Sequence, residues 1–568
     1  MNKTILTSQR NRTVIVLTLC LISILPMTAQ NASWAKKAAQ SVFTLKTFRA
    51  DGSLLASSNG FFIDTDGLAV SSYSPFKGAH RAVIIDALGK ELPVESLIGA
   101  NDMYDVAKFR VESKKVSPLS IATTASMTGD DAWLLPYAVK KEPRCPRGTV
   151  SHVELFQDKY TYYTIDMQAS EQHIGSPVMN AQGQVIGILQ PAADSKQNKS
   201  YAVSAQFATD LRLSGLSVND PALRLTSVPL AIPDELSDAT LSLYVASSSM
   251  KGERYADYIE RFIRKYPNAS DGYVYRARLH AVQDDYAAAD QDMQQAIAVA
   301  EKKDDAHYQY AQLISQKVIY KATPPYEPWT LSRAMEESQE AYRISPQPIY
   351  RQLQAQLLFA QNDYEAAYQV YMELTATNLR GPELFYAAAQ CKLHAGQRDV
   401  QIALLDSAVN TFSQPYVKTA APYLLARAQA LNEAGKYRPA VSDYNAYEKL
   451  MGSQLNSNFY FLREQAEFAG HLYQQAIDDI KRAIELEPQE PVYHAEKANI
   501  ELRVGMADEA LASARECIRL SPDHSDGYLF LGLALCVKGQ KQEGLENLRK
   551  AKELGDPQAQ TFIDRYSK

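Results

Sequence analysis

Serine and histidine side chains that could take part in acyl transfer lie in the first third of the chain. Ser176 stands on a tight Gly-Ser-Pro turn, and His80 and His173 are in its neighbourhood. A serine hydroxyl attacks a carbonyl only when a histidine takes its proton, an aspartate orients that histidine and backbone amides stabilise the oxyanion. The surrounding elements must therefore bring such groups together before any chemistry can occur.

The segment that would position these residues, residues 38–210, has the pattern of a series of short β-strands. Residues 41–48 alternate apolar and polar side chains, and residues 60–64, 82–86 and 185–189 are short apolar runs bounded by turn residues. Asp-Gly, Leu-Gly and Gln-Gly pairs supply turns between them. Strands spaced in this way predict a pair of all-β barrels.

Three stretches make this prediction specific. Residues 59–79 read N-G-F-F-I-D-T-D-G-L-A-V-S-S-Y-S-P-F-K-G-A, residues 98–111 read I-G-A-N-D-M-Y-D-V-A-K-F-R-V, and residues 173–188 read H-I-G-S-P-V-M-N-A-Q-G-Q-V-I-G-I. In order and spacing they resemble the triad-bearing segments of HtrA/Deg-type trypsin-like serine proteases, and residues 200–204 match the strand that usually follows. The resemblance implies a chymotrypsin/trypsin-like double barrel.

The resemblance also locates the three catalytic positions. The ungapped match over residues 66–79 places Ser74 where the family has its histidine, and the second stretch keeps the acid as Asp105. Counting back three residues from Pro177 places Ile174 at the nucleophile position. Serine is not a base near neutral pH, and isoleucine has no group that attacks a carbonyl. We therefore expect a pseudoprotease in which Asp105 is structural and accepts hydrogen bonds from backbone amides.

The loop that would form the oxyanion hole also departs from the family pattern. Gln172 stands in place of a glycine, and His173 stands in place of the asparagine before the nucleophile. Ser176, two residues past the nucleophile position, could act as a substitute only if the whole loop were redrawn, and no histidine aligns with the base position. Because triad residues act as a unit, the loss of two of them is expected to abolish acyl transfer.

Signatures of other chemistry do not occur in the sequence. There is no H-E-x-x-H, no C-x-x-C pair, no Walker glycine-rich loop and no clustered His, Asp and Glu at metal-ligand spacing. We therefore expect neither a cofactor nor a bound metal. A formal net charge of −6 without a basic stripe argues against a nucleic-acid partner.

Residues 1–29 have the pattern of a cleaved secretory signal peptide. A basic stretch precedes an apolar run over residues 14–25, which is too short to cross a bilayer, and small residues follow up to Ala29. No later stretch is apolar for long enough to span a membrane. We expect cleavage near Ala29 and export to the periplasm or the medium.

The cysteines do not form a disulfide framework on this reading. Four of the five lie beyond the predicted leader, which is too few for such a scaffold in a chain of 568 residues. Cys517 and Cys536 could pair only if adjacent helices bring them within reach. Buried free thiols are the favoured interpretation.

From about residue 240 the sequence consists of helix-forming residues with a period of 34. Ala476, Ala510 and Gly544 are 34 residues apart, as are Pro488 and Pro522. Small residues also recur seven positions apart, which puts both on one face of a helix and lets a neighbouring helix approach. This helix-turn-helix period resembles the tetratricopeptide repeat (TPR) family.

The small residues and the turns before them locate the individual repeats. Turn residues are predicted five positions before the first small residue, at Asp284, Asn362, Gly435, Gly505 and Gly539. A longer step of 45 residues, which contains Thr323-Pro324-Pro325, predicts an inserted loop. The first small positions are residues 289, 334, 367, about 401, 440, 476, 510 and 544, with a ninth irregular repeat that ends at Tyr266-Pro267.

A single repeat cannot bury its own faces, so the array is expected to stack into a right-handed solenoid. The resemblance to the TPR family implies that its concave groove binds an extended peptide or a partner helix. Most of the 34 tyrosines are expected to pack between helices. The partner's identity does not follow from the sequence.

The chain as a whole is predicted to be multidomain, with an all-β double barrel followed by an all-α TPR solenoid. The predicted parts are a signal peptide at residues 1–29, a trypsin-like pseudoprotease domain at 34–212, a linker at 213–237 and about eight to nine repeats at 238–568. The predicted function is an exported, non-catalytic adaptor that binds protein partners. The alternatives are an active serine endopeptidase whose repeats recruit substrate, and a chaperone-like holder that captures peptides without cleaving them.

Overall fold

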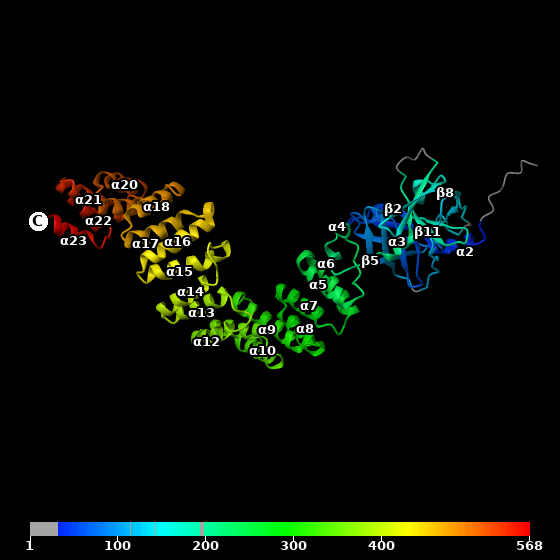
Figure 1. Ribbon diagram of the computed structural model, residues 1–568, viewed down its shortest axis with the longest axis horizontal. Helices are drawn as coiled ribbons and strands as arrows, with labels where there is room; N and C mark the ends of the chain where they lie inside the picture. The colour runs from blue at the N-terminus through cyan, green and yellow to red at the C-terminus, as the bar shows by residue number, and fades with distance from the viewer. Residues whose placement is uncertain (1–31, 114, 141–142, 193–197, 568) are drawn as a thin grey trace, which may run out of the picture. The chain divides into compact units, whose positions relative to one another are not determined.

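The computed structural model describes residues 32–567, except residue 114, residues 141–142 and residues 193–197. The predicted signal peptide lies outside the described residues. The chain divides into two compact units between Glu301 and Lys302. We call them the barrel unit and the helical unit, and Figure 1 colours them by residue number.

Two closed six-stranded barrels form most of the barrel unit. The strand order is β1-β2-β3-β6-β5-β4 in the first and β10-β11-β12-β9-β8-β7 in the second, with neighbours antiparallel. The predicted double barrel is therefore confirmed. The strands are β1 (Val42–Phe48), β2 (Leu54–Phe62), β3 (Leu68–Ser71), β4 (Arg81–Ile85), β5 (Glu91–Asn101), β6 (Val106–Val111), β7 (Asp131–Leu134), β8 (Arg147–Phe156), β9 (Tyr160–Asp166), β10 (Pro177–Met179), β11 (Val185–Gln190) and β12 (Ser200–Ser204).

Side chains of β1 face two different cores because successive residues of a strand point to opposite faces. Phe43 and Leu45 pack inside the first barrel with Phe109. Val42 joins a second cluster that also contains Val185 of the second barrel. The alternation in the sequence therefore serves both the inside of one barrel and the contact between the barrels.

The segment predicted as a linker, residues 213–237, packs on the first barrel. The backbone amide of Leu97 donates to the carbonyl of Pro229, and the amide of Ala231 donates back to the carbonyl of Leu97. The first helices after it share the core of that barrel through Leu243 and Phe262. This segment and the first repeats are thus part of the barrel unit.

Paired helices make up the rest of the chain, and the two helices of each pair pack against each other. The eighteen helices from α5 to α22 form nine pairs in the described chain. They are α5 (Leu236–Ser249), α6 (Gly252–Lys265), α7 (Ser270–Val282), α8 (Tyr286–Val299), α9 (Lys303–Tyr320), α10 (Leu331–Ile344), α11 (Pro348–Ala360), α12 (Tyr364–Leu374), α13 (Pro382–His394), α14 (Arg398–Val409), α15 (Ala421–Glu433), α16 (Tyr437–Met451), α17 (Ser457–Ala469), α18 (Tyr473–Leu486), α19 (Pro491–Arg503), α20 (Ala507–Leu520), α21 (Ser525–Val537) and α22 (Lys541–Glu553), followed by α23 (Ala559–Ser567).

Short helices connect the larger elements. They take up loops before, between and after the strands, and two of them carry the segments examined below. They are α2 (Ala35–Ala38), α3 (Ala205–Asp210) and α4 (Pro221–Arg224), together with the 3₁₀ turns η1 (Ala39–Ser41), η2 (Ser74–Phe76), η3 (Glu171–His173), η4 (Ser217–Asn219), η5 (Lys418–Ala420) and η6 (Gly452–Gln454).

The turns inside the pairs lie where the sequence predicts them. A helix commonly ends with one residue in the left-handed region, which Gly, Asn and Asp adopt most easily. Gly396 and His471 take the same conformation in two further pairs. The five predicted turn residues, Asp284, Asn362, Gly435, Gly505 and Gly539, have φ between 64° and 82°.

The small residues lie at the close contacts between paired helices. Six of the predicted first small positions are alanines with no exposed surface: Ala289, Ala334, Ala367, Ala440, Ala476 and Ala510. At Gly544 the helices approach so closely that a Cβ atom would lie 2.5 Å from Cys536 Sγ. The repeat whose first small position is predicted near residue 401 has the larger Gln401 there, and this side chain is also buried.

The 45-residue step in the repeat period contains an added loop and a lengthened helix. Residues 321–330 form the predicted loop, but α9 also has 18 residues, against 13 in α7 and α11. The insertion therefore makes α9 longer than the corresponding helices α7 and α11, in addition to forming the loop.

Candidate functional site

Ser74, at the predicted position of the catalytic base, lies at the start of η2 just after β3 and is exposed. Its backbone amide donates a hydrogen bond to Asp105 Oδ1 at 2.5 Å. Asp105 itself has a φ of 47°, a conformation that is uncommon for a residue other than glycine. The structure thus brings these two predicted positions together, and the aspartate accepts from the main chain of Ser74.

Tyr73 fixes the segment that carries Ser74. Its ring is fully buried in the first barrel, and its hydroxyl donates to the carbonyl of Ala222 at 2.5 Å. Burial, together with the nearby Asp102 and Asp220 carboxylates, raises the pKa of Tyr73 to about 12. The neutral phenol is therefore a hydrogen-bond donor throughout the physiological range.

Ile174, at the predicted nucleophile position, follows the last residue of the 3₁₀ turn η3. Its amide donates to the carbonyl of Glu171 at 3.2 Å, and the amide of His173 donates to the carbonyl of Ser170 at 2.9 Å. An oxyanion hole needs backbone amides that point free toward the substrate. Here the amide of Ile174, at the predicted nucleophile position, is bonded within its own loop.

The loop is held against the first barrel by neutral polar groups. The carbonyl of Ile174 accepts from the amide of Asn59 at 2.9 Å and from Ser58 Oγ at 3.0 Å. Asn59 Nδ2 donates to the carbonyl of Gln172 at 2.6 Å. Ser71 Oγ donates to the carbonyl of Asn59 at 2.5 Å.

A further pair of hydroxyls completes this arrangement, in which Ser58 Oγ and Ser72 Oγ are 2.6 Å apart and buried. We call Ser58, Asn59, Ser71 and Ser72 the hydroxyl network. The sequence reasoning did not single it out, although a Ser-Asn pair just before the predicted strand at residues 60–64 and a Ser-Ser pair at residues 71–72 were a signal. Their buried oxygens and amide need partners, and the loop supplies two carbonyls.

Gly175 allows the loop to come this close to β2. Its φ is +81°, and a Cβ atom there would lie 2.1 Å from the carbonyl oxygen of Asn59. Real Cβ atoms do not approach a backbone oxygen this closely, so only glycine fits. The path of the loop therefore depends on Gly175.

The candidate substitutes Ser176, His80 and His173 are not brought together. Ser176 has no exposed surface, and its Oγ has no hydrogen-bond partner within the described residues. His173 Nδ1 lies 3.4 Å from Ser170 Oγ, and partial burial lowers its pKa. His80 is exposed, and its amide donates to the carbonyl of Phe48.

A second set of polar residues recurs in the paired helices. Arg276 and Asp292, Arg427 and Asp443, and Arg463 and Asp479 are each 16 residues apart and form bidentate ion pairs with N–O distances of 2.6–3.2 Å. We call these the arginine pairs. Sequence analysis missed them, although each Asp stands three residues after a predicted small position.

Cavities in the helical unit offer candidate binding surfaces. One of about 610 Å³ lies along α19 and α21 and is bordered by α23. Leu529 and Phe530 supply apolar surface, while Glu496, Asp526 and Arg503 add charge. Burial raises the pKa of Glu496. A second cavity lies between α9, α11 and α12.

No group of three or more metal-ligating side chains occurs among the described residues. In the same part of the chain, no helix is both long and apolar enough to cross a membrane. Cys145, Cys391, Cys517 and Cys536 are free thiols, and the last three are buried. Burial raises the pKa of the Cys517 thiol to about 11, which makes it unreactive at neutral pH.

The double barrel and the paired helices define a trypsin-like domain followed by tetratricopeptide repeats. Residues 58–188 match the family described as the trypsin-like peptidase domain. The chain is also 35% identical over 85 residues to the Small glutamine-rich tetratricopeptide repeat-containing protein 2 of Mycosarcoma maydis. That match spans 15% of this chain and 24% of the length of the relative.

Two solved structures each match 32% of this chain. The active form of the M. tuberculosis protease Rv3671c is 18% identical, with 32% of this chain and 83% of that chain covered and a TM-score of 0.27. An inactive form of the Rv3671c protease is 18% identical, with 32% and 91% covered and a TM-score of 0.27.

Proposed function

We propose that this protein is an exported, non-catalytic adaptor: its trypsin-like domain does not hydrolyse peptides, and its repeats bind protein partners. The observation that carries the proposal is the chemistry at the two reactive positions, Ser74 and Ile174. Neither side chain can perform the step that the mechanism requires there. Asp105 alone cannot replace them.

The hydrogen bonds around Ile174 support the same proposal. A working site must hold amides ready for a developing oxyanion, and these donors account for a large part of the rate. The amide of Ile174 is instead bonded to Glu171, and its carbonyl is bonded to the hydroxyl network. Restoring activity would thus require a new loop conformation as well as new side chains.

The alternative of an active endopeptidase that uses Ser176 has less support. A nucleophile must reach its base within hydrogen-bond distance and must be open to substrate. Ser176 has no exposed surface, and its hydroxyl bonds to neither the His173 nor the His80 imidazole within the described residues.

The catalytic part of the proposal is tested with purified protein that begins after residue 29. We expect no cleavage of casein and no labelling by a fluorophosphonate probe, both for this protein and for Ser176→Ala. Labelling of the parent that disappears in Ser176→Ala would overturn the proposal. Capture of casein without cleavage would favour the chaperone-like alternative.

The adaptor part is tested separately by capture from an extract of the cell envelope. The full mature chain is used as bait, because the first repeats share a core with the first barrel. We expect specific proteins to be retained and to be competed by free bait. Export is tested by locating the processed N-terminus near Ala29 with mass spectrometry, and an unprocessed cytoplasmic chain would contradict it.

A further inference from the structure

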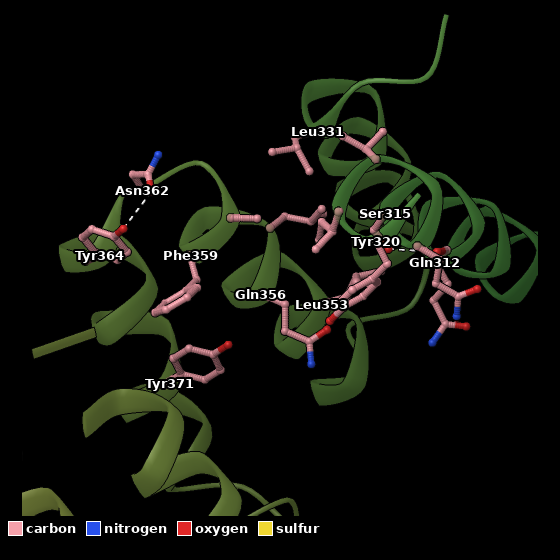
Figure 2. A pocket seen from close by; sticks show the side chains of 15 residues that line it. Gln312, Ser315, Tyr320, Leu331, Leu353, Gln356, Phe359, Asn362, Tyr364 and Tyr371 are labelled. Carbon is pink, nitrogen blue, oxygen red and sulfur yellow. Dashed lines mark hydrogen bonds between the residues drawn. The ribbon is translucent and has the colours of Figure 1, made fainter. Parts of the chain in front are cut away.

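A cavity of about 760 Å³ lies between α9, α11 and the start of α12 (Figure 2). Tyr320 lines it from α9, while Gln356 and Phe359 line it from α11 and Tyr371 from α12. All of these elements belong to the helical unit. The cavity is lined only by residues of this unit.

The insertion in the repeat period helps to form this cavity. The last turn of the lengthened α9 carries Ile319 and Tyr320 into its wall, and these apolar side chains are 38% and 84% exposed. Leu331, the first residue after the inserted loop, closes another side. A repeat of regular length would lack both parts of the wall.

The cavity is lined without any charged side chain. All fifteen residues around it are apolar, aromatic, hydroxyl or amide residues. A charged ligand group would lose its hydration on entry and find no opposite charge, which is costly. The chemistry of the walls therefore selects an uncharged occupant, in contrast to the cavity near Glu496 and Arg503.

Several polar atoms in the cavity are available for hydrogen bonds. The side-chain amides of Gln316 and Gln356 are exposed and have no partner among the described residues. The ring of Tyr371 is 95% buried, and burial raises the pKa of its hydroxyl, which also has no such partner. Primary amides offer donors and an acceptor together, which matches the alternating N–H and C=O groups of a peptide backbone.

We propose that this cavity binds an uncharged peptide segment that carries an aromatic or large aliphatic side chain. The amides of Gln316 and Gln356 pair with the peptide backbone, and Tyr371 contributes its hydroxyl. Leu353 and Phe359 pack against the inserted side chain. The inference rests on the proposed protein-binding role of the repeats and names the class of segment that they select.

The test measures binding of three blocked heptapeptides to the full mature chain by isothermal titration calorimetry. The first contains Phe, Leu, Asn and Gly only, and the others replace two Asn residues with Lys or with Glu. We expect the uncharged peptide to bind at least tenfold more tightly than either charged one. Equal or tighter binding of a charged peptide, or no binding of the uncharged one, would overturn the inference.

Matched variants locate the site. Gln356→Glu places a charge at the exposed wall of the cavity, and we expect it to raise the Kd of the uncharged peptide at least fivefold. Tyr371→Phe keeps the buried ring and should raise the Kd about threefold. Gln369→Glu makes the same change on the outer side of α12, where Gln369 is exposed and bonds to Glu365, and should have no effect. An unchanged Kd in Gln356→Glu would sink the proposal.

Two further outcomes separate this inference from the proposed function. If chitohexaose binds more tightly than the peptide and Gln356→Glu abolishes that binding, the cavity is a carbohydrate site and the peptide assignment is wrong. If only charged peptides bind, the inference fails while protein binding by the repeats stands. Failure of the role itself is read from the envelope capture, which does not depend on this cavity.

Discussion

Buried polar groups are satisfied in two different ways in the two regions of this molecule. Between the barrels they are neutral, since the hydroxyl network bonds to the carbonyls of Ile174 and Gln172. In the repeats they are charged, since each arginine pair holds a carboxylate that is only 6% exposed. The same need for partners is met by hydroxyls in one region and by ions in the other.

The contrast between neutral and charged partners affects stability in the two regions differently. A neutral network holds two segments together at any physiological pH, so the double barrel does not depend on a charged triad. A buried ion pair, in contrast, becomes costly as soon as one partner is removed, because the other charge remains without water. The repeats should therefore be more sensitive than the barrels to the loss of single polar side chains and to pH.

The largest effect is expected from Arg463→Ala. Arg463 is 6% exposed and bonds to Asp479, Glu448 and Asn445. Its loss leaves the Asp479 carboxylate buried without a positive partner, so the free energy of unfolding should fall by roughly 3–5 kcal/mol. Urea unfolding followed by far-UV circular dichroism measures this change.

The matched control for that variant is Arg343→Ala. Arg343 forms its ion pair with Glu340 at the surface, with 71% of its side chain exposed. Such pairs contribute little, so no measurable change in stability is expected. Equal losses in the two variants would contradict the contrast between buried and surface charges.

The second effect is a fall in the stability of the repeats as the pH rises. Burial raises the pKa of Glu464 to about 9 and that of Glu467 to about 8, and nearby carboxylates add to both shifts. Between pH 4.5 and about 8 the native state holds these protons while the unfolded state has lost them. The free energy of unfolding should thus fall with rising pH, by up to about 1.4 kcal/mol per pH unit for each group.

Glu464→Gln should make this pH dependence shallower and should stabilise the protein most at the alkaline end. Urea unfolding at pH 5.5, 6.5 and 7.5 gives the slopes for the parent and the variant. Parallel slopes would show that Glu464 is not the group that loses its proton on unfolding. The barrel transition, followed by the fluorescence of Trp34 and Trp133 in a Trp329→Phe background, serves as the internal comparison.

A smaller effect is expected from Asn59→Ala in the hydroxyl network. The change removes the bond to the carbonyl of Gln172, which lies near solvent and can bind water instead. It also removes the hydrogen bond that Asn59 Oδ1 accepts from Thr44 Oγ1. We expect a loss of about 1–2 kcal/mol in the barrel transition, without pH dependence. The control Ser53→Ala, at an exposed turn of the same barrel, should leave that transition unchanged. A loss above 3 kcal/mol in Asn59→Ala would mean that removing a buried neutral group costs as much stability as removing a buried charged one.

The smallest effect concerns the thiols. Because Cys517 and Cys536 are free, a reducing agent should shift the unfolding midpoint by less than the error of the measurement. Four thiols should react with a maleimide in denaturant, and the three buried ones should react slowly in the native protein. A midpoint that falls on reduction would reveal a disulfide.

Most of the architecture could be predicted because its determinants are local. Alternation over residues 41–48 indicated a strand, and the spacing of Ala476, Ala510 and Gly544 indicated paired helices. Turn residues such as Gly505 were recognisable because few residue types adopt a positive φ. The positions of Ser74, Asp105 and Ile174 followed from motifs that lie within single segments.

The partners of the site residues could not be predicted in the same way. Asn59 and Gln172 are 113 residues apart, and Ser58 and Ile174 are 116 apart. The residues close to Asn59 in the sequence do not indicate which distant carbonyl its side-chain amide will bond to. The arginine pairs could have been predicted, because each Arg and its Asp are separated by the same 16 residues within one helix pair.

The sequence by itself determined the strands, the repeats and the side chains at the three predicted triad positions, because each depends on residue types within a short span. Only the tertiary structure decided that the amide of Ile174 is already bonded, that residues 213–237 pack on the first barrel and that an insertion forms an uncharged cavity. These properties depend on which distant surfaces meet. Hydrogen bonding and close packing are settled only when those surfaces are in contact.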